Sequence, residues 1–359
     1  MENQPPRTSQ AKRGKFLQLL RWIALLVAGI VLLIVISGVS YQAIEARADA
    51  RRFRQVGKSV DVGGYNLNID CTGKGSPTVV LVSGLGVPAS GWRLVQPRIG
   101  NSTRVCSYDR AGYGWSDPGP MPRTLSELAK ELHALLENAG EKPPYILVGH
   151  SFGKGSVLVY SKLYPDEVAG MVLADGGPNK LKLPASILAP AEADLRRRER
   201  DRIYASVLYF LGISRFLAKE DIEGAGPPTN DQEWYYHAIQ PKFIRATTSE
   251  VEEQFAGDSE AELADLPPLG DKPLVVLIAG KGMWGLPLTS QDWVDLRKTW
   301  VDGQIQLAQH FSTKGKWLIV SDSSHMIPEE RPDAIVDAVH EVYPGAARQS
   351  RRFLESGGR

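Results

Sequence analysis

The pentapeptide GHSFG at residues 149–153 constrains the fold of this chain more than any other stretch. An apolar run (144–148) precedes it, and a helix-forming run (156–163) follows it. The pattern G-x-S-x-G between a strand and a helix predicts a sharp turn, because the glycines allow neighbouring elements to approach closely. We therefore expect Ser151 at the strained corner of a strand–turn–helix unit, with its hydroxyl exposed.

Short apolar runs alternate with helix-forming runs through most of the chain. Strands are expected at residues 58–62, 65–71, 78–83, 103–108, 144–148, 168–174, 273–279 and 316–321, and helices near 90–98, 124–138, 156–163, 291–309 and 332–343. The first two strands are joined by Gly63-Gly64, which favours a hairpin. This alternation predicts an α/β fold, with a mostly parallel central sheet and helices on both faces. Functional side chains then belong at the carboxyl ends of the strands.

Residues 179–270 interrupt the alternation. This stretch is helix-rich, charged and aromatic, and two Pro-Pro pairs punctuate it. We interpret it as a helical cap inserted into a core made of residues 58–178 and 271–345, followed by a disordered tail over 346–359. A chain of 359 residues, 43% of them hydrophobic, is ample for one such domain with an insertion. The formal net charge of +1 does not suggest a nucleic-acid-binding surface, so we expect no nucleic-acid partner.

No charged residue occurs in the segment 22–44. Because a helix rises about 1.5 Å per residue, about 20 apolar residues cross a bilayer core. We expect a single transmembrane signal-anchor helix over 22–44, between a basic disordered N-terminus (1–21) and a linker (45–57), with the remaining chain outside the cytoplasm. The alternative is a cleaved signal peptide and a secreted protein, because Ala46-Arg47-Ala48 offers a small-x-small site.

Three segments carry a resemblance to a known family. Residues 149–153, the segment 104–117 (RVCSYDRAGYGWSD) and residues 324–332 are similar to motifs of the α/β-hydrolase superfamily. The similarity covers residues 58–178 and 272–343 and is greatest to membrane-anchored or secreted bacterial members with a helical cap. It implies an α/β-hydrolase fold and a serine, an acid and a histidine in that chain order. It implies little about the substrate, because this fold hosts many reactions.

The resemblance and the strand pattern both select His325 as the general base. It follows a strand in a loop of small residues, at the position that the family uses. Its imidazole would take the proton of Ser151 and later deliver it to the leaving group. The pattern places the other histidines differently: His150 lies in the turn and points away from the site in the family, His133 and His310 lie within helices, His340 lies on the last helix, and His237 lies in the cap, where it could contact substrate.

The acidic member of the triad has two candidates. In much of the superfamily it follows the strand after the cap, but the turn at 280–285 contains no carboxylate. Some members place it after the preceding strand, where Asp175 stands before two glycines that would let its carboxylate turn toward His325. Two alternatives stay open: Asp175 as the cap of the first cap helix, and Asp292, on a later helix, as the acid.

By the family pattern, the backbone N–H groups of Phe152 and Leu85 form an oxyanion hole. The chain departs from many relatives in having Ser83-Gly84 instead of His-Gly, and Lys154 instead of a small residue. Because the donors are main-chain N–H groups, the change to Ser83-Gly84 leaves them in place. The change to Lys154 affects how the following helix packs. The same resemblance suggests that three residues brace the loops beside the site: Asp109, Arg110 and Ser116.

The two cysteines, Cys71 and Cys106, each lie at or in a predicted strand. The resemblance makes these strands neighbours in the sheet, and a location outside the cytoplasm would permit a disulfide. Two reduced core thiols are the alternative. No phosphate-binding or metal-ligand spacing is recognisable, so we expect no cofactor and no metal.

These features predict a serine hydrolase that cleaves a carboxylic ester through an acyl-enzyme on Ser151. The apolar N-terminal segment and the cap favour a small, lipophilic acyl substrate and contact with a membrane, and they leave the oligomeric state open. Thioester or amide hydrolysis and aminopeptidase-like chemistry are alternatives on the same fold. A non-catalytic, membrane-anchored binding protein and a membrane scaffolding factor are alternatives of another class.

Overall fold

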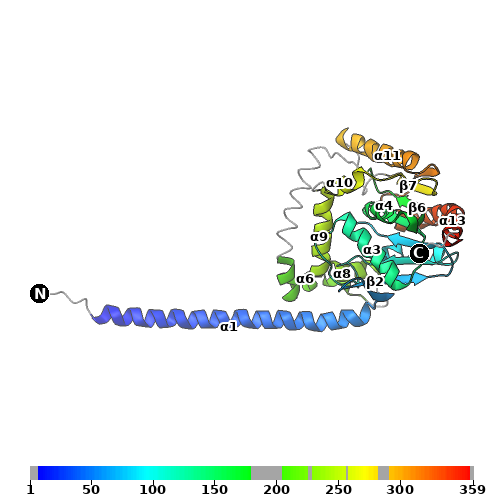
Figure 1. The fold of residues 1–359 in the computed structure, drawn as a ribbon. Coiled ribbons are helices and arrows are strands. Elements are labelled where there is room, and N and C mark those ends of the chain that lie inside the picture. Colours follow the sequence, from blue (N-terminus) through cyan, green and yellow to red (C-terminus); the bar gives the residue numbers. More distant parts are fainter. Residues whose placement is uncertain (1–6, 179–203, 225–228, 256–257, 282–290, 356–359) are drawn as a thin grey trace.

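The computed structural model describes residues 7–178, 204–224, 229–255, 258–281 and 291–355. Its centre is an eight-stranded sheet with the strand order β1-β2-β4-β3-β5-β6-β7-β8 (Figure 1). The strands are β1 (Lys58–Asp61), β2 (Asn66–Thr72), β3 (Thr78–Val82), β4 (Val105–Tyr108), β5 (Tyr145–His150), β6 (Val168–Ala174), β7 (Leu274–Ala279) and β8 (Gly315–Val320).

The pairing confirms the expected mostly parallel sheet. β1 and β2 form the antiparallel hairpin, β2 pairs antiparallel with β4, and the remaining pairs are parallel. β3, β5, β6 and β7 are buried along their whole length. Their sequences are continuously apolar because a parallel strand covered on both faces has no solvent side. The carboxyl ends of β5, β6 and β8 therefore meet at one edge.

Helices cover both faces of this sheet. One face carries a core that includes Leu132, Val157 and Phe311, and the other carries a core that includes Ile99 and Val339. The helices of the first face are α3 (Leu125–Ala139), α4 (Gly153–Leu163) and α11 (Gln291–Phe311), and those of the second are α2 (Gln96–Gly100), with the 3-10 turn η1 (Ala89–Trp92), and α13 (Pro332–Glu355). Short turns of helix, η2 (Pro165–Glu167) and α12 (Ile327–Glu330), connect other elements. The single helix expected near 90–98 is thus two short ones.

Between β6 and β7 the described residues are mostly helical. They form α6 (Ile213–Leu217), α7 (Lys219–Ile222), α8 (Asn230–Ala238), α9 (Pro241–Phe255) and α10 (Asp258–Ala264), and residues 204–210 are helical as well. Thr229 begins α8 with a capping box, since its side chain accepts from the Gln232 N–H and the Gln232 side chain accepts from the Thr229 N–H. Residues 179–203, the first part of the expected cap, lie outside the described residues.

The C-terminal helix corrects one expectation. The sequence predicts a disordered tail from residue 346, but α13 continues through Pro344 to Glu355. Tertiary contacts hold the added turns: Ala346 and Ser350 are buried, and the Ser350 and Ser76 hydroxyls lie 3.2 Å apart. Packing against the sheet therefore overrides the proline.

The N-terminal helix corrects a second. α1 is one continuous helix from Arg7 to Arg52, so much of the expected disordered N-terminus and part of the expected linker are helical. The segment contains no proline and extends a strongly apolar helix, which explains why it does not break near residue 44. By length and composition α1 can cross a membrane over part of Gly14–Arg52, and a signal sequence passes the same test. Figure 1 shows α1 running away from the globular part, with α6 beside its inner half.

Cys71 and Cys106 form a disulfide. They stand directly opposite each other in the antiparallel pair of β2 and β4, with Cα atoms 4.1 Å apart. The alternative of two reduced thiols is therefore wrong for this structure. The bridge joins the outer hairpin to the parallel part of the sheet.

Candidate active site

Ser151 lies at the sharp turn between β5 and α4. Its φ angle is +52°, a strained value for a residue with a side chain. Two glycines make the turn possible: a Cβ at Gly149 would lie 2.9 Å from the Gly153 carbonyl oxygen, and a Cβ at Gly153 would lie 2.3 Å from the Val82 carbonyl oxygen. The pentapeptide therefore forms the expected elbow and presents Ser151 at the carboxyl end of β5.

The structure brings Ser151, His325 and Asp175 together. The Ser151 Oγ lies 2.8 Å from Nε2 of His325, and Nδ1 of His325 lies 2.7 Å from Oδ2 of Asp175. His325 is 3% exposed and Asp175 is fully buried. Asp175 follows directly after β6 and has a φ angle of +45°, a conformation that aspartate tolerates better than most residues. Three strand ends thus supply one hydrogen-bonded chain.

Further donors fix the carboxylate of Asp175. Its Oδ1 accepts from the Ala279 N–H at 3.2 Å, from Trp300 Nε1 at 3.0 Å and from Gln304 Nε2 at 3.1 Å. Burial raises the pKa of Asp175, but the hydrogen bond and charge of His325, with the indole and amide donors, outweigh burial and hold that pKa below its ordinary value. Both oxygens are engaged, so the carboxylate serves the histidine rather than the start of a cap helix.

Sequence reasoning missed Trp300 and Gln304. They lie four residues apart on α11, so they share one helix face. Nothing in the local sequence distinguishes this pair from the apolar and polar residues of an ordinary surface helix. Asp292, the other candidate acid, lies at the start of the same helix, and its side chain is outside the described part of the structure.

Two residues near the elbow have structural positions that the sequence did not indicate. Nε2 of His150 donates to the carbonyl oxygen of His325 at 2.8 Å, and the two rings lie 5.0 Å apart, so His150 supports the His325 loop rather than facing away from it. Burial lowers the pKa of His150 to about 4. Lys154 is also buried, which lowers its pKa to about 7, and its Nζ donates to the Gly177 carbonyl oxygen at 2.9 Å. It therefore ties the first turn of α4 to the loop after Asp175.

The turn after β3 passes close to the serine. A Cβ at Gly84 would lie 3.0 Å from the Ser151 Cβ, so only glycine fits there without displacement. Among the described residues, the backbone N–H groups of Leu85 and Phe152 have no hydrogen-bond acceptor. These are the two donors expected of an oxyanion hole.

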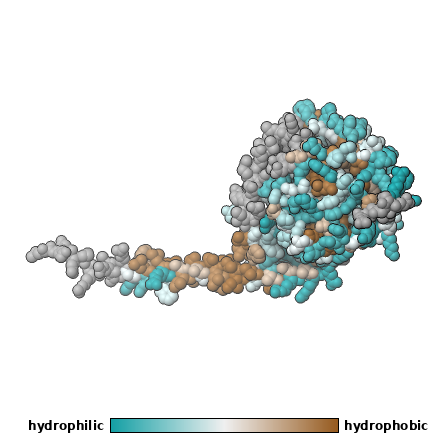
Figure 2. Space-filling view, in the orientation of Figure 1, coloured by the Kyte–Doolittle hydropathy of each residue, from teal (hydrophilic) through white to brown (hydrophobic). Residues whose placement is uncertain are grey.

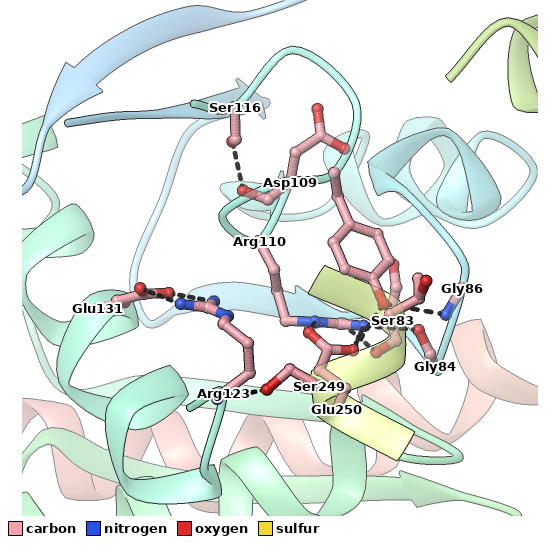
Figure 3. A network of polar contacts seen from close by, with 12 residues as sticks. Ser83, Gly84, Gly86, Asp109, Arg110, Ser116, Arg123, Glu131, Ser249 and Glu250 are labelled. Atoms are coloured by element: carbon pink, nitrogen blue, oxygen red, sulfur yellow. Dashed lines mark hydrogen bonds and ion pairs between the residues drawn. The ribbon is translucent and has the colours of Figure 1, made fainter. Parts of the chain in front are cut away.

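Arg110 holds this turn in place (Figure 3). Its Nη1 and Nη2 donate to the carbonyl oxygens of Ser83 and Gly84 at 2.7 and 2.9 Å. Its guanidinium is paired in turn with Glu250 on α9, at 2.8 and 2.9 Å, and both side chains are buried. Tyr113 completes the link, because its hydroxyl donates to Glu250 at 2.6 Å and accepts from the Gly86 N–H at 3.2 Å. Arg110 thus connects helix α9 to the turn that carries Leu85.

The other residues expected to brace the loops also make such contacts. Buried Asp109 accepts from the Ala89 N–H at 2.8 Å and the Asn68 side chain at 3.0 Å, and Ser116 donates to the Asp109 carbonyl oxygen at 2.6 Å. A second buried ion pair, Arg123 with Glu131, lies nearby (Figure 3). Its bonds run to Glu131 at 2.5 and 2.6 Å rather than to the turn.

The remaining histidines lie outside this chain of contacts. His133 pairs with Glu167, His310 contacts the Gln306 carbonyl oxygen and His340 contacts Ser102. His237, on α8, is 1% exposed and packs against Trp115, and neither ring nitrogen has a partner among the described residues. Burial, with the charge of Lys242, lowers the pKa of His237 to about 3.

Comparison with known proteins identifies the family. A family model described as "Alpha/beta hydrolase family" matches residues 79–338, which is most of the chain. The chain belongs to the α/β-hydrolase family. One relative, "Uncharacterized protein YbdG" of Bacillus subtilis (strain 168), is 28% identical over 268 residues, covering 73% of this chain and 80% of that protein.

Solved structures agree on the fold of this α/β hydrolase. The epoxide hydrolase CorEH superposes with a TM-score of 0.60 at 18% identity, covering 80% of this chain and 98% of its own. A thermophilic esterase from Thermogutta terrifontis superposes with a TM-score of 0.56 at 19% identity, covering 80% and 98%. At such low identities the likeness extends to the fold alone, so the reaction has to be argued from the site.

Proposed function

We propose that this α/β hydrolase cleaves carboxylic esters through an acyl-enzyme on Ser151. The observation that carries the proposal is the unbroken chain from the Ser151 hydroxyl through the His325 ring to the Asp175 carboxylate, with distances of 2.8 and 2.7 Å. When Nδ1 of His325 donates to Asp175, Nε2 offers its lone pair to the serine hydroxyl. That tautomer is the one a general base requires.

In the proposed reaction the Ser151 Oγ attacks the ester carbonyl carbon while His325 accepts its proton. The developing oxyanion is placed beside the free N–H groups of Leu85 and Phe152, which would stabilise it. Collapse breaks the bond to the alcohol, which leaves with the proton from His325, and water then repeats both steps to release the acid. Asp175 stays ionised, because its pKa is held low, and stabilises the imidazolium.

The alternatives have less support. Thioesters and amides would form the same acyl-enzyme, so they are the next substrates to test. Epoxide opening on this fold uses an aspartate nucleophile, whereas residue 151 is serine. The non-catalytic binding protein rested on the missing carboxylate after β7, and Asp175 supplies a carboxylate at 2.7 Å from His325.

We also propose that α1 anchors the protein in a membrane, with the hydrolase part outside the cytoplasm and the substrate a small, lipophilic acyl compound. The inner end of α1 is part of the fold, since Asp49 in its last turns and Phe53 directly after it are buried against the cap helices. Cleavage after Ala48 would remove Gln42, which is also buried. The disulfide between Cys71 and Cys106 is the kind of bond that persists in an oxidising compartment.

The test is covalent labelling of the full-length protein. We expect one fluorophosphonate adduct by intact mass on the native chain and none on Ser151→Ala. Ser156→Ala is the matched control, because Ser156 is a buried serine of α4 outside the triad, and it should keep the adduct. Esters of graded chain length, with thioester and amide counterparts, then identify the substrate class. A folded native protein that forms no adduct would show that the serine is not activated.

A further inference from the structure

The first described segment of the cap, residues 204–217, exposes an unusual amount of apolar surface. Seven large side chains within it are exposed, from 37% for Leu208 to 74% for Leu217. The others are Tyr204, Val207, Phe210, Ile213 and Phe216. A contiguous apolar patch on a soluble surface marks contact with a membrane or another protein. We call these seven residues the cap patch.

α6 is oriented the opposite way from a helix of a soluble domain. It buries Arg215, which is 2% exposed, and turns Ile213, Phe216 and Leu217 outward. A helix on a water-facing surface buries its apolar side instead. The arrangement is favourable where the medium outside the helix is itself apolar.

Arg215 points toward α1. Its guanidinium pairs with Asp49 at 3.0 and 3.2 Å, and its Nη2 lies 3.6 Å from a Glu45 carboxylate oxygen. Both acidic residues lie just beyond the uncharged segment 22–44 of α1. The charged side of α6 is thus fixed to the part of α1 that would emerge from a bilayer.

Close backbone contact places the cap patch at the level of the apolar segment itself. A Cβ at Gly38 would lie 2.4 Å from the Leu211 carbonyl oxygen, and a Cβ at Gly212 would lie 2.9 Å from the Gly38 carbonyl oxygen. About 20 helical residues counted from Trp22 end near Tyr41. Residues 204–217 therefore lie beside the last turns of the candidate span, and Figure 2 shows apolar surface continuing from α1 to this junction.

We propose that the cap patch inserts into the same lipid bilayer that α1 crosses, so that the cap rests in the membrane surface. The occupant of the patch is lipid because the patch is continuous with the apolar surface of α1 and is held to it by the Arg215–Asp49 ion pair and the Gly38–Leu211 backbone contact. This inference rests on the proposed span, and it deepens the proposed function by favouring esters that partition into lipid.

One helix connects this junction to the turn beside Ser151. α8 contacts the end of α1, since Arg52 donates to Gln232 at 2.9 Å and the rings of Phe53 and Tyr236 stack at 4.8 Å. From the same helix, Trp234 Nε1 donates to the Gly86 carbonyl oxygen at 2.8 Å. The contacts with the end of α1 and the contact with the turn after β3 are therefore made by one nine-residue helix.

The test uses the full chain in phosphatidylcholine vesicles. The native cysteines are joined in the disulfide, so a single thiol can be added at Leu217→Cys and labelled with an environment-sensitive fluorophore. Leu318→Cys is the matched control, because Leu318 is a 55% exposed leucine on β8, at the opposite edge of the sheet from β1. We expect the probe at 217 to lose more than half its emission when nitroxide-labelled lipid is included and to resist aqueous iodide. The probe at 318 should do the reverse.

Three results would overturn the proposal. The probe at 217 could be quenched by iodide as strongly as the probe at 318. It could be shielded from both quenchers, which would mean that a second copy or another protein segment covers the patch. The protein could also leave the vesicles in alkaline carbonate, which would remove the span. No readout needs turnover, so repeating the experiment in Ser151→Ala separates this proposal from the proposed chemistry.

Discussion

Two buried arginines link two different cap helices, α9 and α6, to other parts of the molecule, and their partners differ. Arg110 and Arg215 are each 2% exposed and each pairs with a carboxylate on another element. Arg110 also donates to two carbonyl oxygens of the turn beside Ser151, whereas the partners of Arg215 among the described residues are carboxylates of α1 and the cap. The first pair therefore sets the geometry of the turn beside Ser151, and the second sets how the cap sits on the N-terminal helix.

Although both ion pairs are buried, we expect the loss of one to affect catalysis and the loss of the other to affect stability. Breaking the Arg110 ion pair should lower the rate of the reaction, because the turn that Arg110 holds carries one donor of the proposed oxyanion hole. Breaking the Arg215 ion pair should instead lower the local stability of the cap and change its position on α1. Four substitutions, from the largest expected effect to the smallest, test this separation.

Asp175→Asn should have the largest effect, a loss of about 10⁴-fold in kcat, because an amide favours the wrong tautomer of His325. The Oδ1 bonds to Ala279, Trp300 and Gln304 can persist, so the melting temperature should change little. Steady-state hydrolysis of a soluble ester and thermal unfolding measure the two quantities. Asp292→Asn is the control, and the assignment is wrong if that variant is the one that loses activity.

Glu250→Gln should lower kcat by about tenfold to a hundredfold, less than the ~10²–10³-fold expected when an oxyanion donor is lost outright. The turn loses its anchor, while KM should change little. The change also breaks a buried ion pair, which costs about 3–5 kcal/mol of unfolding free energy.

Glu131→Gln is the matched control for that variant, because it breaks the buried pair with Arg123 without touching the turn. Its cost in unfolding free energy should be similar, and its kcat should stay near the native value. Equal losses of kcat in the two variants would mean that Arg110 acts on stability alone.

Arg215→Met should leave the hydrolysis of a soluble ester within about twofold of native. It leaves the buried carboxylate of Asp49 without its partner, so we expect a loss of about 3 kcal/mol in local stability. Faster amide hydrogen exchange over residues 45–53 and 204–224 should report this loss of local stability. Lys219→Met, which removes an exposed pair with Glu223 at 3.9 Å, should change exchange little. A large fall in the rate for Arg215→Met would erase the distinction between the two arginines.

His237→Phe should have the smallest effect, visible only in acid. The pKa of His237 is lowered to about 3, so the unfolded chain binds a proton below its ordinary pKa of about 6.5 and the folded chain does not. This histidine therefore costs no stability above about pH 6.5 and progressively more as the pH falls, about 2 kcal/mol at pH 5. Denaturant unfolding at pH 7 and pH 5 measures this. Between the two pH values, the free energy of unfolding should fall less in His237→Phe than in the native protein. Substituting exposed His340 should leave the pH dependence of the native protein intact.

Much of the fold was predictable because it depends on local sequence patterns. Buried parallel strands need continuous apolar runs, and β6 has the predicted bounds. Thr124 begins α3 by accepting from the Glu127 N–H at 3.2 Å, and Gly140 ends it with a φ angle of +82°. The extension of α13 past Pro344 was not predictable, because long-range contacts of the added turns hold it.

The candidate site divides in the same way. Ser151 and His325 stand in recognisable motifs at strand ends, and Asp175 stands before the glycines that let it turn. The residues that orient these groups carry no local signal, since Trp300, Gln304 and Glu250 are ordinary helix residues until the chain folds.

The sequence by itself determined the elbow, the order of strands and helices, and the long apolar segment, because each depends on neighbours within a few residues. Only the tertiary structure decided that Asp175 reaches His325, that Glu250 anchors the turn after β3 through Arg110, and that Arg215 fixes the cap to α1. These contacts join residues more than 100 positions apart in the chain. Their partners are chosen by how whole elements pack, and local sequence does not encode that choice.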